Sequence, residues 1–206
     1  MKRILTIYLA LFSTILLSQN TYIQCGKLID TKKGKVHSNK TIIVSKDRII
    51  DVKNGFITST DSGDTTIDLT NATVMPGFID MHVHIENEYD PKRYINEFTL
   101  NEADRAFNSL EYAEITLLAG FTTVRDLGGS GVNISLRDAI NEGKVIGPRI
   151  FTAGKAIGTT GGHADPTNGY KKVLQGDPGP KEGVINSIDD AKKAVRQRYK
   201  DGADNI

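Results

Sequence analysis

The sequence predicts an α/β fold, in which a small β-rich region precedes the first three to four strand–helix units of a (β/α)8 barrel. Three observations support this fold class. Residues 20–73 read as short strands and turns. From Val74 onward, apolar β-branched stretches alternate with helical patterns, which implies parallel strands joined by crossover helices. Polar residues suited to chemistry also recur just after these strands, where barrel enzymes hold their active sites.

The β-rich region contains four candidate strands, at residues 22–29, 41–44, 48–53 and 65–69. The two residues Lys46 and Asp47 suit a tight hairpin turn, because aspartate tolerates the left-handed conformation better than most side chains. No residue of this region stands out chemically. We therefore expect a small β-domain over residues 20–73, and we place the catalytic part of the fold in residues 74–206.

The region after Val74 begins with a strand-like segment, residues 73–84, followed by a helix. The pair Thr99 and Glu102 has the spacing of a capping box, and Gly120 ends the helical pattern. Residues 121–127 form the next candidate strand, and a shorter helix after it stops at Gly143.

Residues 149–156 form a third candidate strand, and a long Gly- and Pro-rich connection separates it from the last helix. Ser187 and Asp190 have capping-box spacing, and Gly202 ends the helix. Its periodicity predicts that Ile188, Val195 and Tyr199 face inward, together with Ala191 and Ala194. Residues 203–206 look like the opening of a fourth strand.

A doubly wound sheet also fits alternating strands and helices. It would be expected to carry a Gly-rich phosphate-binding turn after its first strand, and the residues after His84 (IENE) cannot serve as one. A closed barrel needs about 250 residues, more than the 206 of this chain. We therefore expect a truncated barrel, the N-terminal part of a longer protein.

The N-terminal residues predict a signal peptide over residues 1–19. Lys2 and Arg3 precede an apolar stretch at residues 4–17, which is shorter than the ~20 residues of a membrane span. The alternative is an uncleaved anchor helix. Cys25 is the only cysteine, so no internal disulfide can form, and the residues before it do not form a lipobox. We expect an exported protein, periplasmic or secreted, without a lipid anchor.

Composition excludes one class of partner. The net charge is +1 and no basic run occurs, so electrostatics gives no reason to expect nucleic-acid binding. A small-molecule substrate remains the expected partner, and formation of a homo-oligomer is left open.

His82 and His84 are the candidate metal ligands. Alternate residues of a strand leave the same face, so both imidazoles would point into one site. Zinc favours nitrogen, sulfur and oxygen ligands in compact geometry, whereas Ca²⁺ and Mg²⁺ take oxygen ligands. The alternative is a pair of strand-end histidines that form hydrogen bonds and nothing more.

Three further residues are candidates for supporting roles. Asp80 lies within the first strand of the barrel region and Asp126 ends the second, where each could orient a metal ligand. His163 lies in the long connection between residues 158 and 183, and it could donate a hydrogen bond to a substrate carboxylate or carbonyl. Long connections without structure of their own are often functional. The alternatives are a structural Arg125–Asp126 pair and an ordinary loop histidine.

Four segments of the chain resemble motifs of the amidohydrolase superfamily. They are residues 76–84 (PGFIDMHVH), 120–129 (GFTTVRDLGG), 147–154 (GPRIFTAG) and 160–165 (TGGHAD). The last of these is similar to the subgroup that contains imidazolonepropionase and Xaa-Pro dipeptidase-like enzymes. The resemblance runs from about Tyr22 to the end of the chain.

The resemblance implies a (β/α)8 barrel flanked by a small β-sandwich made from both chain ends. It also implies one or two divalent metal ions, usually zinc, with His82 and His84 as ligands. A carboxylated lysine on the fourth strand, two histidines and an aspartate would complete the site beyond Ile206. That aspartate would be the general base, so this chain would contain no catalytic base and would be inactive by itself.

The activity implied by the resemblance is metal-dependent hydrolysis of amide or peptide C–N bonds. The loop around His163 favours a Xaa-Pro dipeptidase-like enzyme acting on a dipeptide. The alternatives are imidazolonepropionase-type ring opening, a catalytically inactive binding protein, and a truncated gene product.

Overall fold

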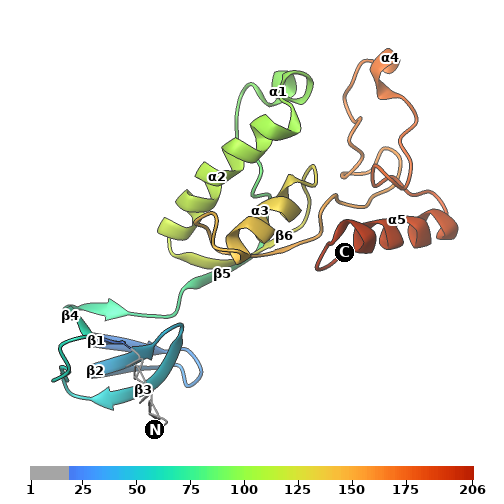
Figure 1. Cartoon of the computed structure of the whole chain (residues 1–206). Coiled ribbons are helices and arrows are strands. Elements are labelled where there is room, and N and C mark those ends of the chain that lie inside the picture. The colour runs from blue at the N-terminus through green and yellow to red at the C-terminus, as the bar shows by residue number, and fades with distance from the viewer. Residues whose placement is uncertain (1–18) are drawn as a thin grey trace, which may run out of the picture. The chain divides into compact units, whose positions relative to one another are not determined.

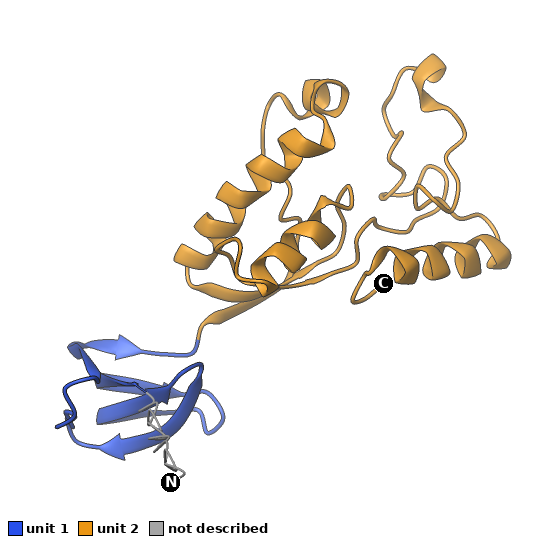
Figure 2. Cartoon of the chain, viewed as in Figure 1, with its two compact units in different colours: residues 1–76 blue, residues 77–206 orange. Residues whose placement is uncertain are grey.

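A computed structural model describes residues 19–206, so the predicted signal peptide lies outside the described residues except for Gln19. The chain forms two compact units, the first ending at Pro76 and the second running from Gly77 to Ile206 (Figure 2). Within residues 19–206, no helix is long and apolar enough to cross a membrane.

The first unit is a four-stranded sheet with the strand order β3-β2-β1-β4 (Figure 1). Its strands are β1 (Asn20–Asp30), β2 (Lys35–Ser45), β3 (Arg48–Asn54) and β4 (Thr65–Val74). β1 pairs with β2 in antiparallel and with β4 in parallel orientation, and β2 pairs with β3 in antiparallel orientation. Cys25, Ile42 and Ile43 are buried in this unit.

The turn between β2 and β3 forms at the predicted residues, but a different residue adopts the left-handed conformation. Lys46 has a positive φ of 55°, and Asp47 does not. The expectation that aspartate would adopt the left-handed conformation was wrong.

The second unit contains a parallel three-stranded sheet of order β5-β6-β7. Its strands are β5 (Phe78–Val83), β6 (Phe121–Asp126) and β7 (Arg149–Thr152), and its helices are α1 (Arg93–Thr99), α2 (Glu102–Leu118), α3 (Val132–Asn141), α4 (Lys172–Gln175) and α5 (Ile188–Asp201). Consecutive parallel strands joined by crossover helices confirm the predicted α/β class and form part of a (β/α)8 barrel.

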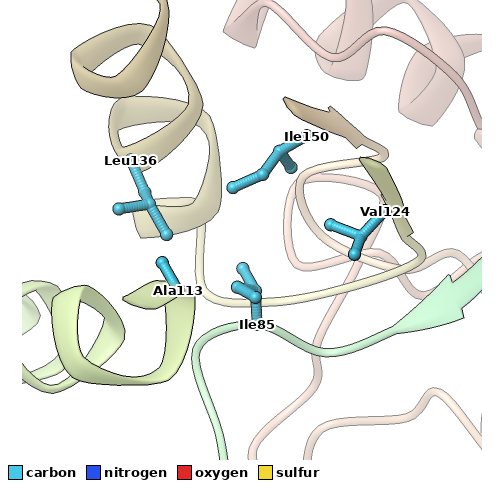
Figure 3. Packing of buried hydrophobic residues seen from close by; sticks show 5 residues of the cluster. All are labelled: Ile85, Ala113, Val124, Leu136 and Ile150. Atoms are coloured by element: carbon cyan, nitrogen blue, oxygen red, sulfur yellow. The ribbon is translucent and has the colours of Figure 1, made fainter. Parts of the chain in front are cut away.

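A small apolar core joins the sheet to α2 and α3 (Figure 3). Val124 of β6 and Ile150 of β7 meet Ala113 of α2 and Leu136 of α3, and Ile85 completes the cluster just after β5. Each of these five side chains is at most 4% exposed. The cluster therefore fixes the ends of β5 and β6 relative to each other.

The helix boundaries show which predicted caps form. Ser187 Oγ accepts the Asp190 N–H at 3.1 Å, and Gly202 ends α5 with a φ of 94°, as predicted. The capping box predicted at Thr99 was wrong, because Thr99 belongs to the last turn of α1 and its hydroxyl bonds Ile95 O. Instead the Asp104 carboxylate accepts the Asn101 N–H at 2.9 Å at the start of α2.

Three other element predictions differ from the structure. The strand predicted at residues 149–156 is shorter, because β7 ends at Thr152. The strand predicted at residues 73–84 is interrupted between β4 and β5, where Pro76 lacks the N–H that a sheet ladder needs. Residues 203–206 are not in a strand.

The face of α5 predicted to be buried is largely open. Ile188 is 77% exposed and Tyr199 is 84% exposed. Ala194 is buried as expected, but the large buried side chain of this helix is Arg198. Its guanidinium donates to the carbonyl oxygens of Pro180 and Lys181, at 3.3 Å and 2.9 Å.

Candidate metal and substrate site

The two histidines of the HVH segment lie together at the end of β5. The ring centroids of His82 and His84 are 5.4 Å apart, with an angle of 68° between the ring planes. Both residues are exposed. The i, i+2 spacing at a strand end therefore brings two imidazoles to one place, as the sequence predicts.

A backbone carbonyl selects the tautomer of His84. Its Nδ1 lies 2.7 Å from Gly128 O. A carbonyl oxygen can only accept, so in the neutral imidazole Nδ1 carries the hydrogen and Nε2 keeps a lone pair. This arrangement, with one ring nitrogen bound to a backbone oxygen and the other available, is typical of metal-binding histidines.

The hydrogen bond between Asp80 and His82 involves the backbone of His82 and not its imidazole ring. Asp80 Oδ1 accepts the His82 N–H at 2.9 Å. The pairing of β5 with β6 shifts register between Asp80 and Val83, and Arg125 Nε donates to Met81 O at 2.8 Å in this irregular stretch. Asp80 and Arg125 thus fix the backbone conformation that presents His82.

Asp126 is fully buried at the end of β6 and joins two loops. Its Oδ2 accepts the Ile85 N–H at 2.9 Å, and its Oδ1 accepts the Gly128 N–H at 3.0 Å and Asn133 Nδ2–H at 2.9 Å. Burial raises the pKa of this carboxyl above its ordinary value, although the three hydrogen bonds oppose that rise. Asp126 thereby positions residues on both sides of the His84–Gly128 contact.

Glu86 is a buried residue of the same network that sequence reasoning missed. It is 3% exposed, and its two carboxylate oxygens accept the N–H groups of Ser130 and Asn133 at 2.8 Å and 2.7 Å. These donors lie at the start of α3, whose N-cap residue, Gly131, has no side chain. A helix start without a capping side chain was the sequence signal for a distant acceptor.

His163 lies beside a cavity of about 450 Å³ whose lining includes neither His82 nor His84. The lining is formed by Arg93, Tyr94 and Glu97 of α1 and by residues of the connection after β7 (His163, Ala164, Asp165, Pro166, Asn168 and Tyr170). His163 itself is exposed. The structure therefore places the predicted substrate-binding residue in a cavity wall that contains two tyrosines, one arginine and two carboxylates.

The buried carboxylate of Asp165 organises this loop. It accepts the N–H groups of Gly161 and Thr167 at 2.8 Å and 2.9 Å, as well as the Thr167 hydroxyl at 2.8 Å. These hydrogen bonds lower the pKa of Asp165. The backbone on both sides of His163 is thus fixed by one side chain.

The donor set suits a divalent metal in part. His82 and His84 offer two imidazole nitrogens near each other, which zinc accepts readily. Within residues 19–206, no group of three or more His, Cys, Asp or Glu side chains is arranged to hold a metal ion. The described residues therefore fit two positions of a metal site and do not fill it.

The parallel strand–helix sheet is part of a (β/α)8 barrel, and His82 and His84 lie close together where its first strand ends. The chain belongs to the amidohydrolase family, whose family model matches residues 73–206.

Among solved structures, the chain is similar to a Xaa-Pro dipeptidase with methionine bound in its active site. The sequence identity is 50% and the TM-score is 0.83, over 90% of this chain and 46% of that one. A prolidase complexed with N-methylphosphonate-L-proline is 31% identical, with a TM-score of 0.73, over 90% of this chain and 45% of that one.

Among curated proteins, the ochratoxinase of Aspergillus niger is 28% identical, over 89% of this chain and 40% of that protein. The chain therefore spans less than half the length of these relatives. This share agrees with the expectation of an incomplete barrel.

Proposed function

We propose that the protein is an exported metal-dependent hydrolase of amide or peptide C–N bonds, with dipeptides of the Xaa-Pro type as its substrates. The orientation of His84 carries the metal-binding part of this proposal, because its Nδ1–H is held by Gly128 O and its Nε2 is left to bind a metal. The similarity to a Xaa-Pro dipeptidase and to a prolidase supports the substrate class.

His82 and His84 would hold one or two zinc ions. When bound, zinc supplies a Lewis acid for the scissile carbonyl and lowers the pKa of water. The residues of this chain hold the two histidines in position. Asp80 fixes the backbone amide of His82, and Gly128 O fixes the ring of His84. Two ligands held on one rigid strand end lose little conformational freedom when a metal binds.

The cavity beside His163 would contribute substrate contacts. Arg93 is a permanent cation in its wall, and Tyr94, Tyr170 and His163 can each donate a hydrogen bond. A substrate carboxylate or carbonyl is the complementary group. Asp165 would keep His163 in place, since its carboxylate holds the backbone on both sides of that residue.

The test is the metal content and peptidase activity of the full-length protein with His82→Ala or His84→Ala. The wild type should carry ~1–2 equivalents of zinc or a similar ion. Each substitution should remove metal and abolish hydrolysis of an Xaa-Pro dipeptide. His37→Ala, which changes a histidine of β2 in the first unit, is the matched control. Wild-type metal content in either variant would refute the proposal.

A further inference from the structure

Glu86 closes the N-terminus of α3 from a position only two residues beyond His84. Its carboxylate oxygens accept the N–H groups of Ser130 and Asn133, and the side chain is 3% exposed. The first N–H groups of a helix have no partner within it, and the helix dipole favours a negative charge there. Because the N-cap is Gly131, Glu86 supplies the acceptor that a capping side chain would otherwise provide.

The segment from Gly128 to Ser130 carries the carbonyl that orients His84, and every residue of it is held. Gly128 N–H donates to Asp126, Gly129 N–H donates to Gly154 O at 2.8 Å, and Ser130 N–H donates to Glu86. The fit is close, because a Cβ placed on Gly129 would clash with the Glu86 carboxylate. Glu86 is the anchor at the end of this segment that leads into α3.

We infer that Glu86 is a positioning residue of the metal site, acting on His84 through the Gly128 carbonyl. This inference rests on the proposed metal-binding role of His84. Glu86 holds Ser130 and Asn133, these hold the turn that contains Gly128, and Gly128 O sets the rotation of the His84 imidazole. Loss of the carboxylate would release the Ser130 end of this turn, while Gly128 and Gly129 keep their hydrogen bonds to Asp126 and Gly154 O, and would widen the range of directions in which Nε2 points.

A role as a direct metal ligand does not fit Glu86. Each of its oxygens already accepts a backbone N–H at 2.7–2.8 Å, and the side chain is buried. Asn133, one of its partners, also donates to Asp126 and to Gly154 O. The carboxylate is therefore committed to a buried network that joins the segments after β5, β6 and β7.

The test uses the full-length protein with Glu86→Ala and Glu86→Gln. Zinc affinity is measured by competition with a chromophoric chelator, and the visible spectrum of the Co²⁺-loaded protein is recorded well below the unfolding temperature. We expect Glu86→Ala to weaken zinc binding about 10–100-fold, the usual effect of losing a group that orients a ligand, and to alter the Co²⁺ spectrum. Glu86→Gln keeps one acceptor oxygen and should fall between wild type and Glu86→Ala.

Glu88→Gln is the matched control, because Glu88 is an exposed acid two residues further on. It should leave zinc affinity and spectrum unchanged. Wild-type zinc affinity and spectrum in Glu86→Ala would overturn the inference even if the protein melted at a lower temperature, since Glu86 would then only cap α3. If Glu86→Ala does not fold, Glu86→Gln decides by the same two readouts.

His84→Ala distinguishes failure of this inference from failure of the proposed function. If His84→Ala binds zinc as the wild type does, the proposed metal site is wrong and the role of Glu86 falls with it. If His84→Ala loses zinc and both Glu86 variants bind it normally, only the inference about Glu86 is refuted.

Discussion

Asp126→Ala should be among the most destabilising single substitutions in the second unit. Asp126 is fully buried and accepts three hydrogen bonds, from Ile85 N–H, Gly128 N–H and Asn133 Nδ2–H. Each buried donor left without an acceptor costs about 1–3 kcal/mol. Removing a buried carboxyl group whose pKa is raised by burial offsets part of that cost. We therefore expect a loss of about 2–5 kcal/mol in the free energy of unfolding.

Urea unfolding of the full-length protein, followed by circular dichroism, measures this loss for the barrel transition. Asp177→Ala is the control, because Asp177 is exposed in the connection after β7. It should change the free energy of unfolding by less than about 0.5 kcal/mol. If Asp126→Ala were as stable as Asp177→Ala, the three hydrogen bonds could not be holding the ends of β5 and β6 together, and the reasoning would be refuted.

Two further substitutions probe the backbone on which the candidate site rests. Gly129→Ala should weaken zinc binding and cost about 1–3 kcal/mol of stability, because its methyl group would meet the Glu86 carboxylate. Gly63→Ala, which has open space around it, is the control and should change neither the zinc affinity measured with the chelator nor the stability measured in urea. Asp165 has a lowered pKa, so its stabilisation of the His163 loop is present above the unfolded value of about 3.9 and is lost as pH falls through the folded value. The protection factor of amide exchange at Gly161 and Thr167, taken relative to the intrinsic rate at each pH, should therefore fall in acid in the wild type. In Asp165→Asn the protection factor should not change with pH in this range, and an equal change in both proteins would contradict this account.

Local patterns were sufficient to predict the three strands and the three longer helices of the second unit, and insufficient to predict the short helices α1 and α4. The alternation after Val74, the cap at Ser187 and the helix end at Gly202 depend on residues close in sequence, and all three appear in the structure. Predictions failed where a competing local contact decided the outcome. Thr99 caps nothing because α1 extends through it, and α1 has no strong sequence signal of its own.

The candidate site was only partly readable from sequence for a related reason. The pairing of His82 with His84 follows from strand periodicity alone. The role of Glu86 depends on donors at Ser130 and Asn133, more than forty positions along the chain, which only the fold brings near. Arg198 lies on the same face of α5 as Ala191 and Ala194, and only the fold brings the carbonyls of Pro180 and Lys181 to its guanidinium.

The two ends of the connection that contains His163 lie side by side. Gly158 and Val184 form a parallel bridge, and Gly158 N–H donates to Gly183 O at 2.9 Å. Gly183 has a φ of 103°, and a side chain there would clash with Ala156 O.

A loop whose two ends are hydrogen-bonded to each other can change in sequence and length without moving the strands that it connects. Doubling the length of a flexible loop costs only about 0.6 kcal/mol in closure entropy. Residues between the joined ends can thus be lengthened, shortened or replaced while the sheet stays unchanged. Substitutions, insertions or deletions between Gly158 and Val184 could therefore change which ligands bind in the cavity beside His163, while the bridge between these two residues stays in place.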